Sequence, residues 1–385
     1  MARNFSNFME GYLEYTSKQE SPEQFHVWSA ISIIASALGR SCWMNRGYYT
    51  LFPNMYVVLV AESALCRKST STKLAMQLLR YTGKDIINEK LTMAYLYKHL
   101  AKASKGTGTD AALVIYAPEL GVFLGSDAHA TGLVAAITSL YDCPEIAEYL
   151  TKNSGQDVIH NPVINILGAT TLDWMSTNLP GESVEGGFTS RVIFVVEDAP
   201  RHRIAWPKVT SVETDLKSKL IEDLLQINAL KGQFKVTDEA MEMFNTWYIE
   251  CKEPDDPRLR GFFGRKGDHI LKAAMIMSVA TRDDLLLDAI HIDLAIQAIE
   301  KVEKKMPIAF RGVAFSKSAK NVDRILSQIE KAGGKVEHAK LLKKNSCYLN
   351  GKEFAEVIQT LIDSEQIFPV LFGNKKGYVL NGGIK

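Results

Sequence analysis

The chain has 385 residues, of which 46% are hydrophobic and 23% charged, and this length and composition are typical of a globular protein with two or three domains. Its net charge of +1 does not by itself indicate a partner. The five cysteines have no paired spacing, which argues against a zinc site or a disulfide framework and indicates a reducing compartment such as the cytoplasm. No apolar run reaches the roughly 18 residues of a membrane span, so no membrane partner is expected.

The N-terminal half begins as helix and continues with an alternating pattern. Phe25, Trp28 and Ile31 recur at helical spacing, so residues 1–50 are expected to form a helical segment. In residues 51–207, short apolar runs of the kind found in strands buried on both faces alternate with helical patterns. The runs are residues 55–60, 113–117, 163–167 and 192–196, and helices are expected at residues 70–80 and 130–141. This alternation predicts an α/β fold with a parallel sheet.

The C-terminal half is first helical and then mixed. Residues 208–312 have the periodicity of a helical lid subdomain, with helices expected at residues 213–228, 238–251, 267–281 and 292–304. Residues 313–385 predict a winged helix, with helices at residues 322–332, 336–344 and 351–364 and strands at residues 367–372 and 377–380. This last module has 12 Lys and Arg against 7 Asp and Glu, a net +5 that leaves −4 for the rest of the chain. Such a basic module predicts a contact with nucleic acid.

The segment LVAESALCRKST, residues 59–70, lies between an expected buried strand and an expected helix, where a phosphate-binding loop belongs. Lys68 supplies the cation for the β- and γ-phosphates. Ser69, with Thr70 beside it, supplies the hydroxyl for Mg²⁺. The segment therefore predicts a site for ATP and Mg²⁺.

This segment departs from the standard motif because it contains no glycine. Arg67 stands where the motif has Gly before Lys, and Glu62 or Ala61 stands where it has its first Gly. Two interpretations stay open: a degenerate nucleotide site, or a basic helix start that follows a core strand.

Several blocks of the chain resemble a family of phage and plasmid replication ATPases, whose loop reads Gly-x-Ser/Thr-x-x-x-Arg-Lys-Gly/Ser-Thr. The residues that fall on this pattern are Ala61 in place of Gly, Ser63, Arg67, Lys68, Ser69 and Thr70. The stretches HVWSAISIIASALGR, LFPNMYVVLVA and GGFTSR and the pairs Tyr141-Asp142 and Asn161-Pro162 are also similar and occur in the same order. The resemblance spans residues 20–310 and implies a P-loop NTPase core of the AAA+/RecA-like type, with Ser63 and Arg67 among the nucleotide-binding residues.

Candidate catalytic groups follow the second and third expected strands. Glu119 lies near the end of the segment LVIYAPEL, where an acidic residue of P-loop motors polarises the attacking water, and a helix cap is the alternative role. The Asp that usually precedes it is absent, so slow or assembly-dependent hydrolysis is expected. Thr170 and Thr171 end the segment VINILGATT and are candidates for sensing the γ-phosphate, the role called sensor 1, with a turn or helix cap as the alternative.

Three basic residues are candidates for a nucleotide contact. Arg191 lies just before a strand in GGFTSRVIFVV, where an arginine of a ring ATPase reaches the γ-phosphate of the neighbouring subunit, and a surface ion pair is the alternative. Arg265 and Lys272 are seven residues apart, which is two helical turns, so they share one face. Their segment is similar to the lid of minichromosome-maintenance helicases, which carries two Arg at this spacing. The resemblance implies that both residues reach a nucleotide, and a solvated charged face is the alternative.

Lysines predict the contacts with DNA. Residues 149–151 and 157–160 are expected to pair as a hairpin with Lys152 at its tip, and ring helicases grip backbone phosphate in the pore with such a hairpin. A solvated turn is the alternative for Lys152. The winged helix offers further lysines for phosphate contacts, and its alternative role is to bind a protein. These lysines are Lys343, Lys344, Lys352, Lys375 and Lys376.

The combined pattern predicts an ATP-dependent DNA helicase or translocase of a phage or mobile-element replication system. It is expected to act as a homo-oligomeric ring, a hexamer, on single-stranded DNA, with a primase or polymerase as a further partner. The alternative is a DNA-binding replication-initiation or loading scaffold that does not hydrolyse nucleotide. The glycine-free loop favours the scaffold, whereas Lys68, Ser69 and Glu119 favour the motor.

Overall fold

The computed structural model describes residues 3–88, 90–104, 110–124, 132–151, 155–178, 187–310, 317–346 and 348–381. The chain divides into two compact units, of which the first ends at Ala309 and the second begins at Phe310. Among the described residues, no helix combines the length and the apolar character that a membrane crossing requires.

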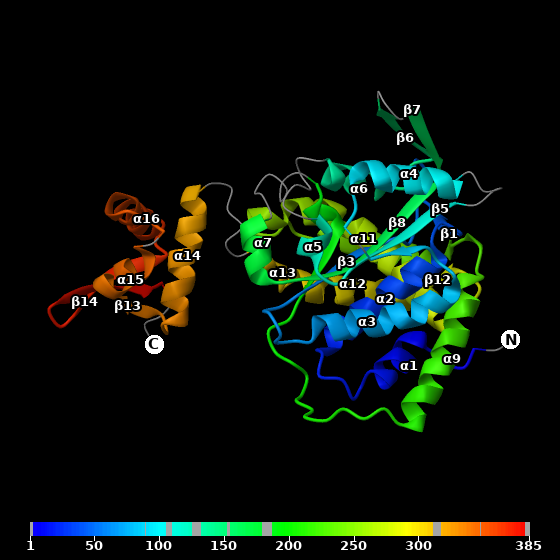
Figure 1. The fold of residues 1–385 in the computed structure, drawn as a ribbon, viewed down its shortest axis with the longest axis horizontal. Helices are drawn as coiled ribbons and strands as arrows, with labels where there is room; N and C mark the ends of the chain where they lie inside the picture. The colour runs from blue at the N-terminus through cyan, green and yellow to red at the C-terminus, as the bar shows by residue number, and fades with distance from the viewer. Residues whose placement is uncertain are drawn as a thin grey trace. The chain divides into compact units, whose positions relative to one another are not determined.

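The centre of the first unit is a five-stranded parallel sheet with the spatial order β4-β5-β8-β3-β9 (Figure 1). The strands are β3 (Tyr56–Val60), β4 (Ile86–Ile87), β5 (Ala111–Ala117), β8 (Pro162–Thr170) and β9 (Val192–Val196). All residues of β3, β8 and β9 are buried, as is typical of a parallel sheet that is covered on both faces. The register aligns Val60 with Thr170 and Val196, so the three strands end at the same edge. The predicted α/β fold with a parallel sheet is confirmed.

The connections of this sheet open a crevice at one edge. From β3 the chain crosses to the sheet edge at β4, returns through β5 and β8, and then passes to the other side of β3 at β9. The connections that leave β3 and β8, two neighbouring strands, therefore run in opposite directions. In open α/β sheets ligands bind at such a switch point, outside the carboxyl ends of the strands.

Helices cover both faces of the sheet, with α4 (Met93–Ser104) and α6 (Leu133–Leu140) on one side and α2 (Glu23–Leu38) and α3 (Lys68–Leu79) on the other (Figure 1). α2 is buried around most of its circumference, which is typical of a helix inside a core. The short helices of this region are η1 (Arg80–Thr82), α5 (Leu120–Leu124), α7 (Leu172–Asn178), η2 (Thr189–Arg191) and α13 (Met306–Ala309). β6 (Ile146–Thr151) and β7 (Gly155–His160) form the expected hairpin.

The N-terminal segment and the helical segment after the sheet belong to the same unit. α1 (Phe8–Tyr15) and α2 pack against α9 (Ser211–Asn228). The expectation of a purely helical N-terminal segment is incomplete, because β1 (Cys42–Asn45) pairs with β2 (Thr50–Leu51) and, in parallel, with β10 (Gly232–Gln233). Strands this short depend on partners that are distant in the sequence. The remaining elements are β11 (Lys235–Val236), α10 (Asp238–Glu250), η3 (Pro257–Leu259), α11 (Arg260–Thr281), β12 (Leu286–Leu287) and α12 (Ala289–Glu303).

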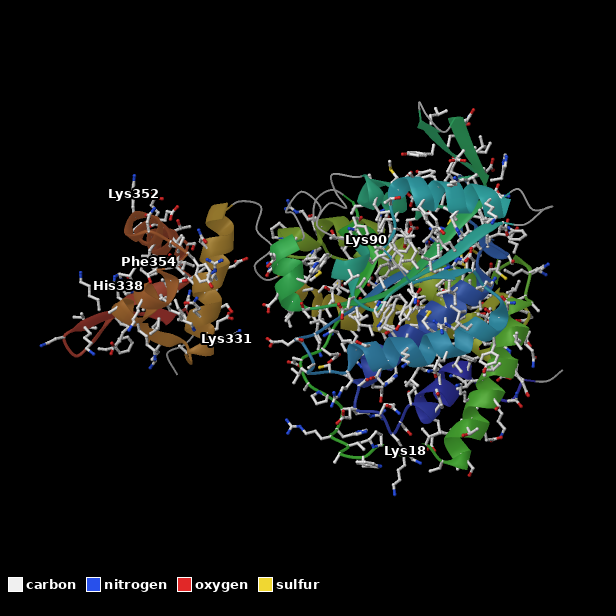
Figure 2. The ribbon with its side chains drawn as sticks, in the orientation of Figure 1. Lys18, Lys90, Lys331, His338, Lys352 and Phe354 are labelled. Carbon is white, nitrogen blue, oxygen red and sulfur yellow. The ribbon has the colours of Figure 1, made fainter. Side chains whose placement is uncertain are left out.

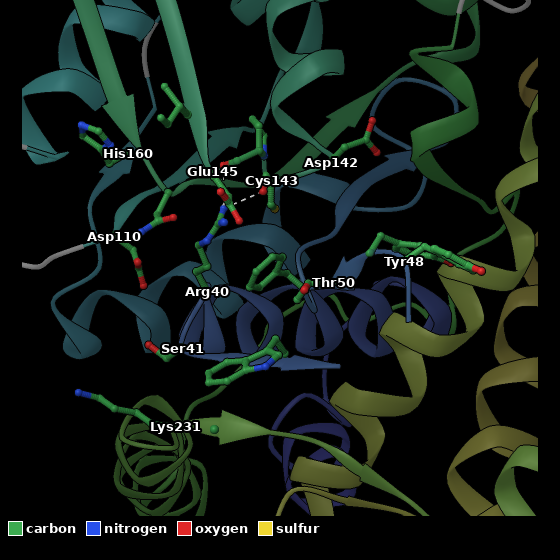
Figure 3. Close-up of a pocket in the computed structure, with 17 residues that line it drawn as sticks. Arg40, Ser41, Tyr48, Thr50, Asp110, Asp142, Cys143, Glu145, His160 and Lys231 are labelled. Atoms are coloured by element: carbon green, nitrogen blue, oxygen red, sulfur yellow. Dashed lines mark hydrogen bonds between the residues drawn. The ribbon is translucent and has the colours of Figure 1, made fainter. Parts of the chain in front are cut away.

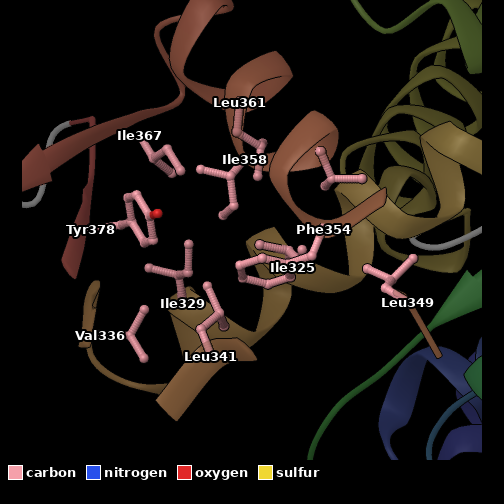
Figure 4. Packing of buried hydrophobic residues seen from close by; sticks show 11 residues of the cluster. Ile325, Ile329, Val336, Leu341, Leu349, Phe354, Ile358, Leu361, Ile367 and Tyr378 are labelled. Atoms are coloured by element: carbon pink, nitrogen blue, oxygen red, sulfur yellow. The ribbon is translucent and has the colours of Figure 1, made fainter. Parts of the chain in front are cut away.

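The second unit combines three helices with a three-stranded antiparallel sheet of order β13-β15-β14. Its elements are α14 (Lys317–Lys331), β13 (Lys335–Glu337), α15 (His338–Asn345), α16 (Gly351–Asp363), β14 (Ile367–Phe372) and β15 (Lys375–Leu380). Ile325, Leu341, Phe354 and Ile367 belong to its own hydrophobic core (Figure 4). The second helix starts later than expected because β13 pairs with β15.

Candidate functional site

The loop between β3 and α3 turns sharply without glycine. Ala64 and Arg67 have φ values of 60° and 48°, in the left-handed region, which costs an L-residue roughly 1–2 kcal/mol. Arg67 is the residue before Lys68, where the standard motif has the glycine that adopts this conformation freely. The backbone at Arg67 is therefore glycine-like although the residue is not.

α3 begins directly after this turn, and its start suits an anion. Arg67 makes no side-chain cap for the helix, so its side chain does not occupy the N–H groups at the helix start. Lys68 Nζ donates to the carbonyl oxygens of Ala61 and Glu62, each at 2.9 Å. Burial lowers the pKa of Lys68, so an anionic partner would stabilise its charge.

A cavity of about 520 Å³ lies beside the start of α3, and its volume is in the range of small-ligand sites. Loops that follow β3, β5 and β8 contribute to it, so it occupies the carboxyl edge of the sheet. Its walls include six predicted site residues: Ser63, Lys68, Ser69, Glu119, Thr170 and Thr171. The other walls are Ala64, Pro118, Leu120, Gly121, Val122, Ala169 and Trp174.

The contacts of Glu119, Thr170 and Thr171 differ. The carbonyl of Glu119 accepts hydrogen bonds from the N–H groups of Val122 and Phe123 at the start of α5, while Glu119 also lines the cavity. Thr171 Oγ1 accepts from the N–H of Trp174 at 3.2 Å, which is the helix-cap role. Thr170 is buried at the end of β8, so it is the better candidate for sensing a phosphate.

Arg67 and Thr70 are not among the residues that line this cavity. Arg67 Nε donates to Glu20 Oε2 at 2.7 Å, and its carbonyl accepts from the N–H of Thr70 at 3.0 Å. Both residues thus contribute to the shape of the turn, and Arg67 would have to leave Glu20 to contact a phosphate.

Arg191 and Arg265 lie at the opposite edge of the sheet. Arg191 precedes β9, whose first residue is paired with Tyr56 at the start of β3, whereas Lys68 follows the end of β3. Arg191 Nη2 donates to Asp142 Oδ2 at 2.7 Å, and Arg265 Nη1 donates to Asp142 Oδ1 at 3.0 Å. Neither arginine lines the cavity of Lys68 in its own chain.

Lys272 is a buried supporting residue, which corrects its expected contact with a nucleotide. Its Nζ donates to Asn54 Oδ1 at 2.6 Å and to the Asn54 carbonyl at 3.1 Å, and the residue is 3% exposed. Nζ also lies 3.9 Å from the ring centroid of Tyr141. Burial lowers the pKa of Lys272 to about 8. The guanidinium carbon of Arg265 lies 6.0 Å from the centroid of the same ring, so Arg265 and Lys272 share one face of the helix, as expected. Of the two residues, only Arg265 reaches the surface.

The lysines predicted to contact DNA are exposed where the structure describes them. Lys343 and Lys344 lie in the last turn of α15, and Lys375 and Lys376 begin β15. Lys375 Nζ lies 3.3 Å from Glu337 Oε2. Figure 2 shows Lys352 on the outside of α16. The remaining candidate, Lys152, lies outside the described residues.

Oxygen donors are the groups available for a metal ion in the cavity. The Ser69 hydroxyl and the Glu119 carboxylate suit Mg²⁺, which keeps several waters and binds substrate phosphates. Within the described ranges, no group of three or more His, Cys, Asp or Glu side chains is arranged to hold a metal. These donors therefore fit an ion that arrives with a nucleotide.

Asp142 bonds to two of the predicted site residues, and the sequence did not indicate this contact. The pair Tyr141-Asp142 belonged to the blocks that resemble the ATPase family, but no spacing rule connects residue 142 with Arg191 or Arg265. Comparisons with protein-family models and with curated proteins find no match for the chain.

Proposed function

We propose that this chain is an ATP-dependent DNA helicase or translocase of a phage or mobile-element replication system, with an AAA+/RecA-like P-loop core, acting in the bacterial host cytoplasm. The observation that carries the proposal is the meeting of Lys68, Ser69, Glu119 and Thr170 in one cavity at the carboxyl edge of a parallel sheet. This cavity combines a helix start, an ammonium group, a hydroxyl and a carboxylate. Phosphoryl transfer depends on such positioned charges.

Each group has a defined role in this proposal. Lys68 exchanges the carbonyls of Ala61 and Glu62 for phosphate oxygens, because hydrogen bonds between charged groups are stronger. Ser69 would hold Mg²⁺, and the ion would neutralise phosphate charge. Glu119 accepts the proton of the attacking water, and Thr170 contacts the γ-phosphate.

The arginines favour an oligomeric ring. Arg191 and Arg265 lie at the sheet edge opposite Lys68, so they are suited to a nucleotide held by the next subunit in a head-to-tail ring, which we propose to be a hexamer. An arginine supplied in this way stabilises the charge of the transition state.

The second unit is proposed to be a winged helix that binds DNA. Its three helices, its antiparallel hairpin and the exposed lysines Lys343, Lys344, Lys352, Lys375 and Lys376 support this assignment. Lys152, which lies outside the described residues and between β6 and β7 in the sequence, is proposed to follow single-stranded DNA. A primase or polymerase is the further partner we propose.

A loading scaffold that does not hydrolyse ATP is the second candidate. The glycine-free loop supports it, and so do the hydrogen bonds that hold Lys68 to its own loop. The scaffold shares the proposed DNA-binding surface, so only turnover separates the two functions.

ATP hydrolysis with and without single-stranded DNA tests the motor. DNA-stimulated turnover is expected for the native chain, with a loss of about 10²-fold or more for Glu119→Gln because the general base is removed. Lys68→Ala is expected to abolish turnover. Asp173→Asn, which removes an exposed carboxylate from α7 near the cavity, is the matched control and should retain turnover. If the native chain binds DNA but does not hydrolyse ATP, the motor function is excluded and the scaffold function remains.

A further inference from the structure

Two guanidinium groups share one carboxylate at the amino edge of the sheet. The side chains of Arg191 and Arg265 are 12% and 27% exposed, and that of Asp142 is 50% exposed. Lys272 is buried beneath them, against the ring of Tyr141. Three cations therefore gather around Tyr141, and Asp142 is the carboxylate that bonds directly to both arginines. Asp268 is a second carboxylate near Tyr141 and Lys272, so the cluster has three cations against two carboxylates in a poorly solvated place, where an additional anion is favoured.

The hydrogen-bond donors of Arg191 also exceed the acceptors around them. Nη1 donates to the Gly187 carbonyl at 2.9 Å, and Nη2 donates to Asp142. Nε is buried and has no hydrogen-bond partner among the described residues. Asp142 divides its two oxygens between the two arginines. A phosphate group offers more acceptor oxygens and more negative charge than this carboxylate.

The arginines are held in place by a buried support. The guanidinium carbons of Arg191 and Arg265 lie 5.9 and 6.0 Å from the ring centroid of Tyr141. His269 Nε2 lies 2.8 Å from the carbonyl of Ser190 and must donate to it, so Nδ1 accepts from the Tyr141 hydroxyl at 3.2 Å. Burial lowers the pKa of His269 to about 3, so this imidazole is neutral and keeps one tautomer. The residue before Arg191 is thereby tied to the ring that supports both arginines.

The shared carboxylate is reachable from outside. Asp142 and Arg265 line a cavity of about 190 Å³, and Asp142 also lines a larger open cavity of about 1140 Å³. Figure 3 shows this larger cavity, with Asp142 and Tyr48 in one part and Arg40 and Glu145 in another. An anion on another molecule can therefore approach Asp142 without unfolding of the support.

We propose that Arg191 and Arg265 form one anion site whose intrinsic occupant is Asp142, and that the terminal phosphate of a nucleotide held by a second copy of this chain displaces Asp142. The identity of that anion rests on the proposed function. Asp142 acts as a positioning residue, because it orients both guanidinium groups before the neighbour binds. Its displacement links the nucleotide state of one subunit to the segment that carries Arg191 in the next.

Binding of inorganic pyrophosphate to the chain, measured by calorimetry, tests this site. The titration uses the Lys68→Ala background, so that the cavity at the carboxyl edge does not contribute. Adding Asp142→Asn is expected to tighten binding about tenfold, because the competing carboxylate is neutralised while its shape remains. Asp142→Glu keeps the charge and is expected to stay within about threefold of the background. Asp268→Asn is the matched control, because Asp268 lines the same small cavity but accepts from Tyr49, and no change beyond twofold is expected.

Unchanged or weaker binding in Asp142→Asn would overturn the inference and leave Asp142 as a structural bridge. If Asp142→Asn does not fold, as judged from its thermal unfolding, Asp142→Ser provides the same test. Adding Arg191→Gln must abolish the gain, and a gain that persists would also overturn the inference. Pyrophosphate binding needs no turnover, so a chain without ATPase activity can still support the anion site, and an active ATPase can still lack it.

Discussion

At the scale of single residues, the loop after β3 pairs an unusual sequence with an unusual backbone. Ala64 and Arg67 adopt left-handed conformations that glycine would adopt freely. Arg67 is held in this conformation by Glu20 and by the hydroxyl of Ser21, which donates to its carbonyl at 3.1 Å. Strain of this kind persists where the surroundings hold the residue in place, often at ligand sites.

Replacement of the strained alanine should stabilise the chain. Ala64→Gly is expected to raise the free energy of unfolding by about 1 kcal/mol, because the cost of the left-handed backbone exceeds the entropy that glycine adds to the unfolded chain. Urea denaturation measures the change. Ala94→Gly, at an exposed position of α4, is the control and should lose up to about 1 kcal/mol. Equal losses at both positions would contradict the assignment of strain.

Because Lys272 is buried, the free energy of unfolding should depend on pH in the alkaline range. Its pKa is lowered to about 8 by burial, against 10.5 in its ordinary state, so between these values the unfolded chain holds a proton that the folded chain has released. Stability therefore rises with pH through this window and lacks this contribution below pH 8. Lys272→Met is expected to remove a rise of about 3 kcal/mol.

The measurement is the urea midpoint of native chain and variant at several pH values from 7.5 to about 10. Lys301→Met, at an exposed position of α12, is the control and should leave the rise unchanged. If the free energy of unfolding changes with pH in the same way for the native chain and for Lys272→Met, the lowered pKa of the buried Lys272 amine is refuted.

At the scale of elements, the sheet of the second unit depends on a glycine in its central strand, where the neighbouring strands approach closely. A Cβ at Gly377, in the central strand β15, would lie 2.3 Å from Phe372 Cε2 and 2.5 Å from the carbonyl oxygen of Val336. The phenyl ring can move, but the carbonyl belongs to the neighbouring strand β13. Gly377 therefore permits both neighbours of β15 to pack against it.

Gly377→Ala is expected to destabilise the second unit by about 2 kcal/mol, because overpacking forces the strand pair apart. Hydrogen exchange of the β13 and β15 amides reports the loss directly. Gly351→Ala serves as the control, since a Cβ there meets nothing within 4 Å and the residue begins α16. Its exchange should be unchanged or slower, and equal acceleration in both variants would exclude the steric cause.

At the scale of the whole molecule, charge is distributed unevenly between the two units. Residues 313–385 carry a net +5 and the rest carries −4. Each unit has its own hydrophobic core, so the basic unit does not need the acidic one for its internal packing. Attraction to a polyanion is therefore expected to concentrate in the second unit.

Neutralisation of two lysines tests this distribution. The double variant Lys343→Gln/Lys344→Gln should lower the slope of log K for single-stranded DNA against log[salt] by about 1.4, if each lysine neutralises one phosphate. Fluorescence anisotropy at several salt concentrations measures the slope. Lys301→Gln/Lys304→Gln, two exposed lysines of the first unit, is the control and should leave it unchanged. The same reduction in both variants would indicate non-specific attraction.

Local sequence patterns predicted most elements and several of the residues that line the cavity beside α3. The apolar runs of β3, β8 and β9 are local signals of buried strands, and they match the structure within a few residues. Lys68 and Glu119 were identified because motif spacing connects residue type to the end of a strand. A strand followed by a helix places its loop at the carboxyl edge whatever the rest of the fold does.

Contacts between groups that are distant in the sequence could not be predicted from local patterns. The pairing of β1 with β10, the burial of Lys272 on Asn54 and the bridging of two arginines by Asp142 each join segments far apart in the chain. Periodicity describes a face of one element and not the partner of that face. The strand order also depends on long-range pairing, and it is this order that places Lys68 and Arg191 at opposite edges of one sheet.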